Sequence, residues 1–371
     1  MEYPLITKKV VRQNRKLRRI QNDTRKRNKH IKGRFPKARI SKVIELTGKK
    51  PFYNLSGLAE IKKMWNGSSL EDILAEIGKY ELVGQSGSGF PTQRKINAVL
   101  NAKTEEKYLL INGVECDPGL LQDEWLLENR FAEIEAGITF LSNYINFKRI
   151  ILAVKESKLQ KLVSSAFDIH IVPDRYPMGE ERILINEVLG RSLNRDEIPA
   201  EYGILVLNLQ TVHAISEILK GEYQAGTKYI TVADYTIGEA VVAKVKVDTA
   251  VSEILMKTLG YREGKESYTG GGIMMGHKAG VNEVITATTN FVAYGMSTQY
   301  LEDGKCRKCG ACARKCPMNI RVDKIVQALE KNKNADVSIY HPETCIRCGT
   351  CTYHCRAGKN TMEAVLHNEG E

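Results

Sequence analysis

Residues 306–317 read CRKCGACARKCP, and residues 345–355 read CIRCGTCTYHC. Each stretch has four cysteines at the spacing C-x2-C-x2-C-x3-C, a pattern that binds iron–sulfur cubanes. Three thiolates on one tight loop can reach three irons of a cubane, whereas the fourth cysteine, carried onto the following helix, points at the other cluster. The doubled pattern therefore predicts a helical domain with two [4Fe–4S] clusters.

The spacing assigns the eight cysteines to two sets. We expect the first cluster to be held by Cys306, Cys309, Cys312 and Cys355, and the second by Cys345, Cys348, Cys351 and Cys316. Zinc sites instead use paired CxxC units with four ligands per ion. Each motif has all four cysteines, which leaves no iron open for radical chemistry on S-adenosylmethionine. The pattern is that of two-cluster bacterial ferredoxins, except for Arg356 in place of a proline and a long insertion between the motifs.

The clustering of the cysteines also bears on the compartment. Eight of the nine cysteines lie in these motifs, and Cys116 is the other one. The chain has no apolar run of about 18 residues, and no apolar stretch or cleavage site follows its basic N-terminus. Clustered cysteines without an export signal favour metal ligation in a reducing, cytoplasmic compartment over disulfides. Cys116 itself is expected to be a loop residue with no catalytic role.

The charge of the chain is unevenly distributed. The net charge over 371 residues is +11, but residues 1–50 contain 18 Lys/Arg and 3 Asp/Glu. The remaining residues carry a net charge of −4, so the basicity belongs to an N-terminal arm that we expect not to fold by itself. Phe35 is the one aromatic residue within the basic runs, which argues against base stacking. We favour an arm that docks a partner protein over a solvated tail, a nucleic-acid binder or a membrane contact.

The region before the cysteines alternates between strand and helix patterns. After two short helices within 55–81 and a helix at 93–103, apolar strands are predicted at 108–112, 149–154, 169–172 and 204–208. Helices are predicted between and after them at 128–144, 157–167, 179–190 and 211–220. This alternation predicts an α/β domain whose parallel sheet is covered on both faces. Strands at 229–232 and 240–244 and a helix at 249–259 predict a smaller strand-rich unit.

A glycine-rich loop, VGQSGSGFPT at residues 83–92, precedes the helix at 93–103. Glycines before a helix let backbone N–H groups approach a phosphate, although such a loop alone is a weak signal. Three further segments follow predicted strands: INGVECDPG at 111–119, YPMGEE at 176–181 and LNLQT at 207–211. Ligands bind at the carboxyl ends of parallel strands, so these segments predict one site.

Taken together, these motifs resemble those of a known family. The GxGxGFPT loop with Lys95, the NGxECxP and YPxGxE segments, GGIMMG at 271–276 and the two cysteine motifs are similar to the RnfC family, which is related to the flavin subunit of respiratory complex I. The resemblance covers about residues 77–371. It implies a Rossmann-like FMN-binding domain at 51–221, a β-grasp (SLBB) domain at 222–280 and a helical two-cluster domain at 281–371, after the arm at 1–50.

The resemblance also implies roles for individual residues. The FMN phosphate and ribityl chain would be held by Gly84, Gly87, Gly89 and Lys95. The flavin would be lined by Asn112, Tyr176, Gly179, Glu180, Asn208 and Thr211. Contacts to flavin or nicotinamide nucleotide would come from Glu115, Asp117 and Glu181. NADH is an expected substrate, although Val114 replaces an acidic residue of the complex I protein and Ala98 replaces an aromatic residue that stacks on the nucleotide.

The expected function is therefore electron transfer from NADH or a partner donor through FMN and two [4Fe–4S] clusters to a redox enzyme. The N-terminal extension typical of membrane RnfC is missing, which implies a soluble, cytoplasmic relative, such as the proteins that serve proline reductase, or one peripheral to a membrane complex. Such an oxidoreductase subunit would work within a multi-subunit complex. Alternatives are a flavin-dependent cobalamin reductase and a nucleic-acid-associated iron–sulfur protein, the latter disfavoured by the acidic body.

Overall fold

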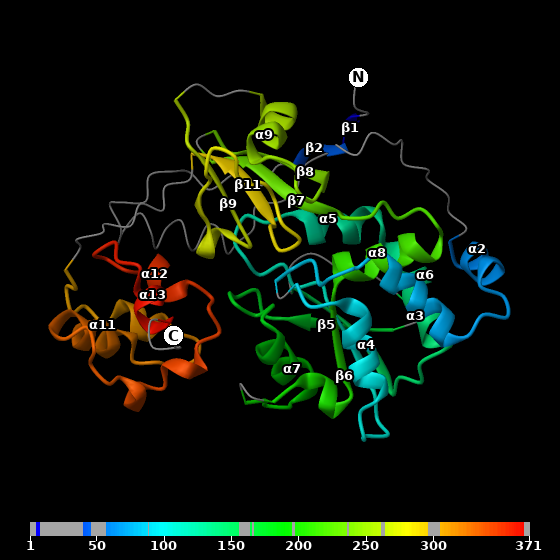
Figure 1. Ribbon diagram of the computed structural model, residues 1–371, viewed down its shortest axis with the longest axis horizontal. Helices are drawn as coiled ribbons and strands as arrows, with labels where there is room; N and C mark the ends of the chain where they lie inside the picture. Colours follow the sequence, from blue (N-terminus) through cyan, green and yellow to red (C-terminus); the bar gives the residue numbers. More distant parts are fainter. Residues whose placement is uncertain are drawn as a thin grey trace.

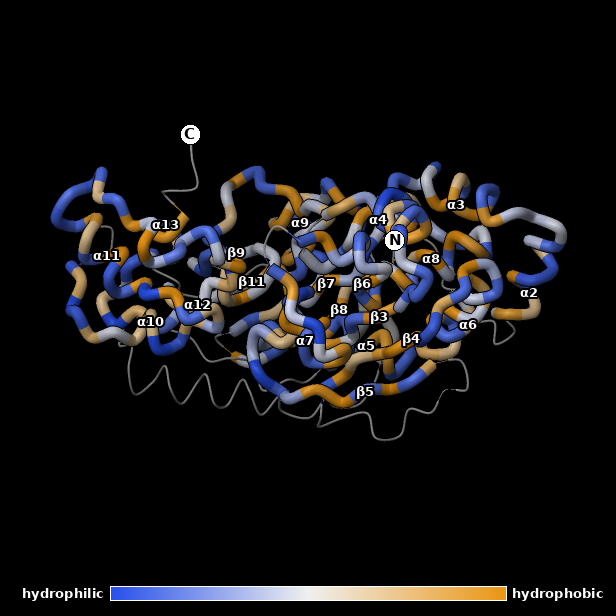
Figure 2. Tube along the Cα trace, turned by 90° about the horizontal axis from the view of Figure 1, so that it is seen from below, coloured by the Kyte–Doolittle hydropathy of each residue, from blue (hydrophilic) through white to orange (hydrophobic). Residues whose placement is uncertain are grey.

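The fold is described from a computed structural model (Figure 1). It describes residues 5–7, 40–45, 57–87, 89–155, 164, 167–194, 197–235, 237–260, 264–295 and 305–366. The cysteine-rich helices lie at one end of the molecule, and α2 (Gly57–Met64) and α3 (Leu70–Lys79) lie at the other end (Figure 2).

A four-stranded parallel sheet organises the first half of the chain. Its strand order is β5 (Asp168–Val172), β4 (Arg149–Lys155), β3 (Tyr108–Asn112) and β6 (Ile204–Asn208). The central strand β3 pairs in register with both neighbours, so Asn112 lies opposite Ala153 and Asn208 at the carboxyl end. The apolar runs thus form the parallel sheet that the sequence predicts.

Helices cover both faces of this sheet. Because strand residues alternate between faces, Leu109 and Ile111 join one core, whereas Leu110 joins another. The first core is shared with α4 (Thr92–Leu100), α5 (Gln122–Asn129), α6 (Phe131–Ser142) and α8 (Leu209–Leu219). The second core is closed by α7 (Glu181–Leu189). A 3-10 turn, η1 (Pro199–Tyr202), precedes β6.

A seven-stranded sheet forms the second unit. Its order is β1 (Leu5–Thr7), β2 (Ile40–Glu45), β8 (Glu239–Lys246), β7 (Thr227–Asp234), β11 (Phe291–Tyr294), β9 (Ser267–Gly270) and β10 (His277–Lys278). The hairpin β7–β8 is antiparallel, whereas β11 runs parallel to β7. One face packs under α9 (Val251–Leu259).

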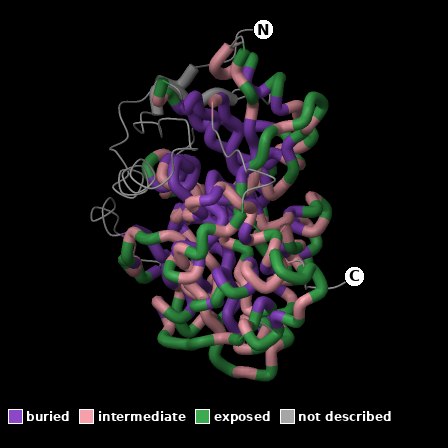
Figure 3. Tube along the Cα trace, turned by 90° about the vertical axis from the view of Figure 1, so that its left-hand side faces the viewer, coloured by how far each residue is buried: buried purple, intermediate pink, exposed green. Residues whose placement is uncertain are grey.

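The opposite face of this sheet packs against the α/β unit. Tyr229, Val242 and Phe291 belong to the same buried cluster as Leu109 and Leu207 of the parallel sheet. The two units therefore share one of their apolar cores, which fixes their relative position. Figure 3 shows this buried interior enclosed by exposed outer loops.

The cysteine-rich unit consists of short helices around two loops. Its elements are α10 (Ala311–Lys315), α11 (Val322–Lys331), η3 (Ser338–Tyr340), η4 (Pro342–Thr344), α12 (Thr350–Tyr353) and α13 (Thr361–Leu366). A small core of Ile320, Val322, Ile325 and Val365 holds α11 against α13.

Three features differ from the elements expected from sequence. The helix predicted at 128–144 is two helices, because Arg130 has a φ of −132° that no α-helix accommodates. The strand β11 lies beyond residue 280, so the second sheet extends into the region expected to be helical. Residues 40–45 of the expected arm form β2 beside β8. The helix predicted at 157–167 lies mostly outside the described residues.

Among the residues described, no helix is both long and apolar enough to cross a membrane.

Candidate flavin and iron–sulfur sites

The carboxyl edge of the parallel sheet carries two neighbouring asparagines. Asn208 donates from Nδ2 to the carbonyl of Asn112 at 3.3 Å and to Asp123 Oδ2 at 3.1 Å. Asn112 donates from Nδ2 to the carbonyl of Gly179 at 2.8 Å, which holds the 176–181 segment against β3. Asn208 is also the N-cap of α8. The structure thus brings the strand-end segments together, as the sequence predicts.

The glycine-rich loop lies against the same edge. Gln85 donates its backbone N–H to Thr211 Oγ1 at 3.2 Å, and the loop ends are closed by a bond from Gly84 N to Phe90 O at 2.9 Å. A Cβ added at Gly87 would meet no atom within 4 Å, and Gly89 has a φ of +60°. There is therefore open space beside Gly87, and a phosphate cradle formed by this loop stays the prediction from sequence.

An ion pair joins the helix after this loop to the 176–181 segment. Lys95 Nζ lies 2.7 Å from Glu181 Oε1, and both side chains are partly exposed. Glu180 caps α7 by accepting from Ile183 N at 3.0 Å. Burial raises the pKa of the Glu180 carboxyl. Gly179 is required by packing, because a Cβ there would lie 2.6 Å from the carbonyl of Val114.

The two acidic residues of the 111–119 segment point to different places. Glu115 is buried and accepts from Asp123 N at 3.2 Å, while its second oxygen, Oε2, has no hydrogen-bond partner among the described residues. Burial and the nearby charge of Asp123 raise the pKa of Glu115. Asp117 instead accepts from Ile273 N at 2.8 Å, so it joins this segment to the 271–276 loop.

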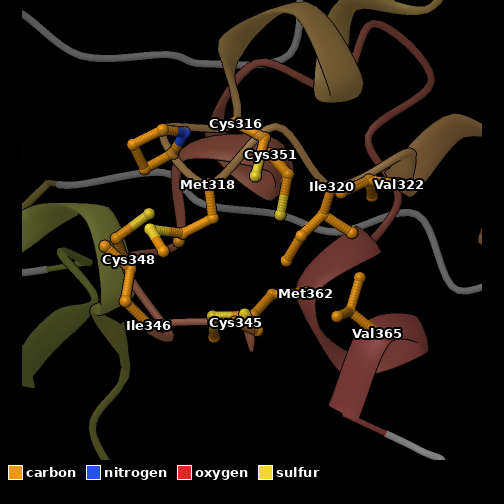
Figure 4. Close-up of a pocket in the computed structure, with 12 residues that line it drawn as sticks. Cys316, Met318, Ile320, Val322, Cys345, Ile346, Cys348, Cys351, Met362 and Val365 are labelled. Atoms are coloured by element: carbon orange, nitrogen blue, oxygen red, sulfur yellow. The ribbon is translucent and has the colours of Figure 1, made fainter. Parts of the chain in front are cut away.

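The eight clustered cysteines line two separate cavities. Figure 4 shows Cys316, Cys345, Cys348 and Cys351 around one cavity, with Met318, Ile320 and Met362 among its apolar walls. The other cavity is lined by Cys306, Cys309, Cys312 and Cys355. This division is the one that the spacing assigns to two clusters, and it brings the fourth cysteine of each motif to the opposite cavity.

The two cysteine loops have the same backbone form. Lys308 and Arg347, each two residues after the first cysteine of its motif, both have a φ of +54°. Their N–H groups donate to Cys306 Sγ at 3.3 Å and to Cys345 Sγ at 3.4 Å. Such N–H···S bonds stabilise thiolates that ligate a cluster. The donor set and the backbone geometry therefore fit two cubanes.

The second cysteine loop directly contacts the α/β unit, which carries the candidate flavin site and is called the flavin unit below. Tyr176, at the strand-end edge, donates its hydroxyl hydrogen to the carbonyl of Cys348. Tyr176 also packs against the buried pair Met274 and Tyr353. A Cβ at Gly349 would lie 2.2 Å from the carbonyl of Met274, so the cysteine loop fits tightly against the 271–276 loop. All three units meet at this point, which we call the Tyr176 junction.

Comparisons with known families agree with both sites. Residues 77–217 match the Nuo51 FMN-binding domain, and residues 305–359 match a 4Fe-4S dicluster domain. The chain is an RnfC-like protein. Its cofactors are FMN and iron–sulfur clusters, so the RnfC-like chain combines a flavin domain with an iron–sulfur domain.

The RnfC-like chain is similar to several curated proteins. It is 29% identical over 262 residues to a subunit of the ion-translocating oxidoreductase complex of Rhodobacter capsulatus, covering 67% of this chain and 50% of that protein. It is 25% identical over 288 residues to a subunit of the proton-translocating ferredoxin:NAD(+) oxidoreductase complex of Clostridium ljungdahlii, covering 75% and 62%. The chain thus spans less than two thirds of the length of these relatives.

Solved structures show the same fold at lower identity. The NAD+-reducing [NiFe]-hydrogenase in the air-oxidized state aligns with a TM-score of 0.58 at 17% identity, covering 85% of this chain and 65% of that chain. The H2-reduced state of that hydrogenase aligns with a TM-score of 0.53, also at 17% identity.

Several site contacts were not expected from the sequence. Asp123 bonds Asn208, whereas Lys228 and Asn290 bond the glycine-rich loop from the second sheet. One feature of the sequence indicates that Lys228 is buried: it lies in the segment TKYITVAD, whose other residues suit a buried strand.

Proposed function

We propose that the RnfC-like chain transfers electrons between FMN at the carboxyl edge of the parallel sheet and a partner protein at the cysteine-rich unit. In this proposal, the phosphate and ribityl chain are held by Gly84, Gly87, Gly89 and Lys95. The flavin is lined by Asn112, Tyr176, Gly179, Glu180, Asn208 and Thr211. FMN exchanges electrons in pairs or singly, whereas a [4Fe–4S] cluster exchanges one at a time.

The hydrogen bond from Tyr176 to the carbonyl of Cys348 carries this proposal. It joins the flavin unit to the loop of the second cysteine set, made of Cys316, Cys345, Cys348 and Cys351. We propose that this set is nearer the flavin, and that the set of Cys306, Cys309, Cys312 and Cys355 faces the partner. Tyr176 then holds the two redox units in a fixed relation.

NADH is the proposed two-electron donor. Glu181 supports this role, because it lies at the strand-end edge and is held by Lys95 at 2.7 Å. Glu115 adds a buried carboxyl oxygen, Oε2, with no hydrogen-bond partner among the described residues. Asp117 contributes indirectly, since it holds the 271–276 loop.

A β-grasp fold is the proposed architecture of the second unit. The hairpin β7–β8, the crossing helix α9 and the strand β11, parallel to β7, support this assignment.

An acidic redox protein is the proposed partner. Residues 305–359 contain twelve Lys/Arg and four Asp/Glu, a formal net charge of +8. Lys305, Arg307, Lys308 and Arg314 are exposed around the first cysteine set. Complementary charge speeds the encounter of redox partners. The basic N-terminal arm, most of which lies outside the described residues, is a second proposed contact with the complex.

The test begins with the anaerobically purified chain. We expect bound FMN and about eight irons per chain, with the clusters reduced when NADH is added. Absence of FMN would overturn the proposal. Reduction only by a reduced low-potential carrier protein, with NADH inert, would replace the proposed donor.

The Tyr176→Phe variant tests the junction. It should keep FMN and iron but slow cluster reduction after NADH addition by roughly tenfold, because the two units lose their fixed relation. Rapid-mixing absorbance separates flavin bleaching from cluster bleaching. Tyr202→Phe is the control, because its hydroxyl bonds Glu197 away from the junction. Equal cluster rates in both variants would exclude Tyr176 from this role.

A further inference from the structure

Lys228, the second residue of β7, is buried, with an exposed fraction of 2%. Its Nζ donates to the carbonyl of Gln85 at 2.9 Å, to the carbonyl of Ala287 at 2.6 Å and to Asn290 Oδ1 at 3.1 Å. An ammonium has three hydrogens, so these three acceptors use all of them. Lys228 therefore ties the glycine-rich loop to the second sheet.

Asn290 extends this contact to the next residue of the loop. Its Nδ2 donates to the carbonyl of Ser86 at 3.2 Å and to the carbonyl of Gly271 at 2.9 Å. Two successive carbonyls of the loop, those of Gln85 and Ser86, are thus held from the side of the second sheet. We call Lys228 and Asn290 the loop clamp.

The clamp determines where the next N–H groups point. In a planar trans peptide, the C=O of one residue and the N–H of the following residue point in opposite directions. Holding the Gln85 and Ser86 carbonyls toward the clamp therefore aims the N–H groups of Ser86 and Gly87 away from it. Ser86 and Gly87 are exposed, and a Cβ at Gly87 would meet no atom within 4 Å.

Successive N–H groups that point into open space bind anions. We propose that Lys228 and Asn290 are positioning residues, which aim the N–H groups of the glycine-rich loop at the phosphate of FMN. This inference rests on the proposed flavin site. It makes the second sheet part of that site, although neither side chain needs to touch the phosphate.

The experiment compares FMN with riboflavin, which lacks the phosphate. Flavin is removed from the full chain, and each ligand is titrated by fluorescence quenching. The wild type should bind FMN more tightly than riboflavin. Lys228→Met and Asn290→Asp should each lose about tenfold or more of FMN affinity. The first variant removes the hydrogen bond to the Gln85 carbonyl, and the second removes the hydrogen bond to the Ser86 carbonyl. Their riboflavin affinity should stay near that of the wild type.

Lys244→Met is the matched control. Lys244 is a buried lysine of the neighbouring strand β8, and its Nζ lies 2.5 Å from Glu217 Oε1 of α8. It ties the same sheet to the same α/β unit without a bond to the glycine-rich loop, so the preference for FMN should survive. The iron content and circular dichroism of each variant report folding, and Asn290→Asp provides the test if Lys228→Met does not fold.

The outcomes separate the inference from the proposed function. A wild-type chain that binds neither flavin contradicts the proposed function itself. A wild type that binds both flavins equally, or clamp variants that retain its preference for FMN, overturns the inference alone. Equal loss of preference in Lys244→Met also overturns it, because the effect would then follow from loosening the sheet.

Discussion

Glu115 shows how burial shapes a single residue of the proposed flavin site. Its exposed fraction is 5%, its Oε1 accepts from Asp123 N, and its Oε2 has no partner among the described residues. Burial disfavours the charged carboxylate, and the like charge of Asp123 adds to this effect, so the pKa of Glu115 is raised. A protonated Glu115 can donate a hydrogen bond, which an ionised one cannot.

This shift predicts a pH dependence of stability. Because the native pKa of Glu115 lies above its unfolded value, the native state binds more protons in the range between the two, and stability falls as pH rises through it. Glu115→Gln cannot titrate. At pH 5 we expect its free energy of unfolding to match that of the wild type, and at pH 8 to exceed it by on the order of 2 kcal/mol.

Denaturant unfolding of flavin-free chains at the two pH values measures this difference. Glu105→Gln, a change at an exposed glutamate, should follow the wild type at both. A constant gap between Glu115→Gln and the wild type from pH 5 to pH 8 would mean that Glu115 does not titrate in this range.

Individual site residues were predictable where their position follows from the chain. Asn112 and Asn208 end apolar strands, so parallel pairing alone brings them together. Asp117 accepts from Ile273 N, a contact between residues 156 positions apart that no local pattern could indicate, and its expected contact with nucleotide stays a prediction. Lys228 could not be assigned, because a lysine in a strand usually marks a solvent face and its burial depends on three acceptors from other segments.

At the scale of elements, the paired cysteine loops provide an internal comparison. Gly310 and Gly349 precede α10 and α12 with φ values of +65° and +70°. A Cβ at Gly310 would meet the flexible end of Arg314, whereas a Cβ at Gly349 would lie 2.2 Å from the Met274 carbonyl. The two positions share the same backbone strain but differ in what lies against them.

Alanine substitutions therefore separate strain from docking. Gly310→Ala should cost about 1 kcal/mol of stability, the usual penalty for a left-handed residue. Gly349→Ala should cost roughly 1–3 kcal/mol more, because backbone must move at the Tyr176 junction. Thermal unfolding measures the costs, and limited proteolysis followed by mass analysis of the fragments reports release of the cysteine-rich unit. Equal costs and equal cleavage would show that the junction does not bear on stability.

Elements were predictable where their pattern is local. The strands at 108–112 and 204–208 are apolar runs bounded by polar residues, and the structure has them at those bounds. The break at Arg130 was missed because the helical periodicity of the sequence continues across it. The structure places the buried guanidinium of Arg130 5.4 Å from the Trp125 ring, a contact that this periodicity does not indicate. The strand β11 was missed because its partners, β7 and β9, are distant in the sequence.

At the scale of the whole molecule, the cysteine-rich unit is the basic part of what the structure describes. Residues 305–359 have a net charge of +8, and this unit lies at the end opposite α2 (Figure 2). The second cysteine set contacts the flavin unit at Tyr176, whereas exposed cations surround the loop of the first set. Under the proposed function, an acidic partner would therefore be drawn to the set proposed to lie farther from the flavin, where electrons would leave or arrive.

This separation predicts a salt-dependent encounter. The double variant Lys305→Glu with Arg314→Glu should lower the second-order rate of electron exchange with an acidic carrier protein by about tenfold at low ionic strength. Lys62→Glu with Lys63→Glu makes the same change of charge on exposed residues of α2, at the far end. At 0.1 M salt, charges more than about 10 Å from the docking surface are screened. At that salt concentration, only the Lys305→Glu with Arg314→Glu variant should still lower the rate of electron exchange. Stopped-flow measurements give the second-order rate constant of each variant across a series of salt concentrations. If the rate constants of both variants depend on salt in the same way, the docking surface lies elsewhere.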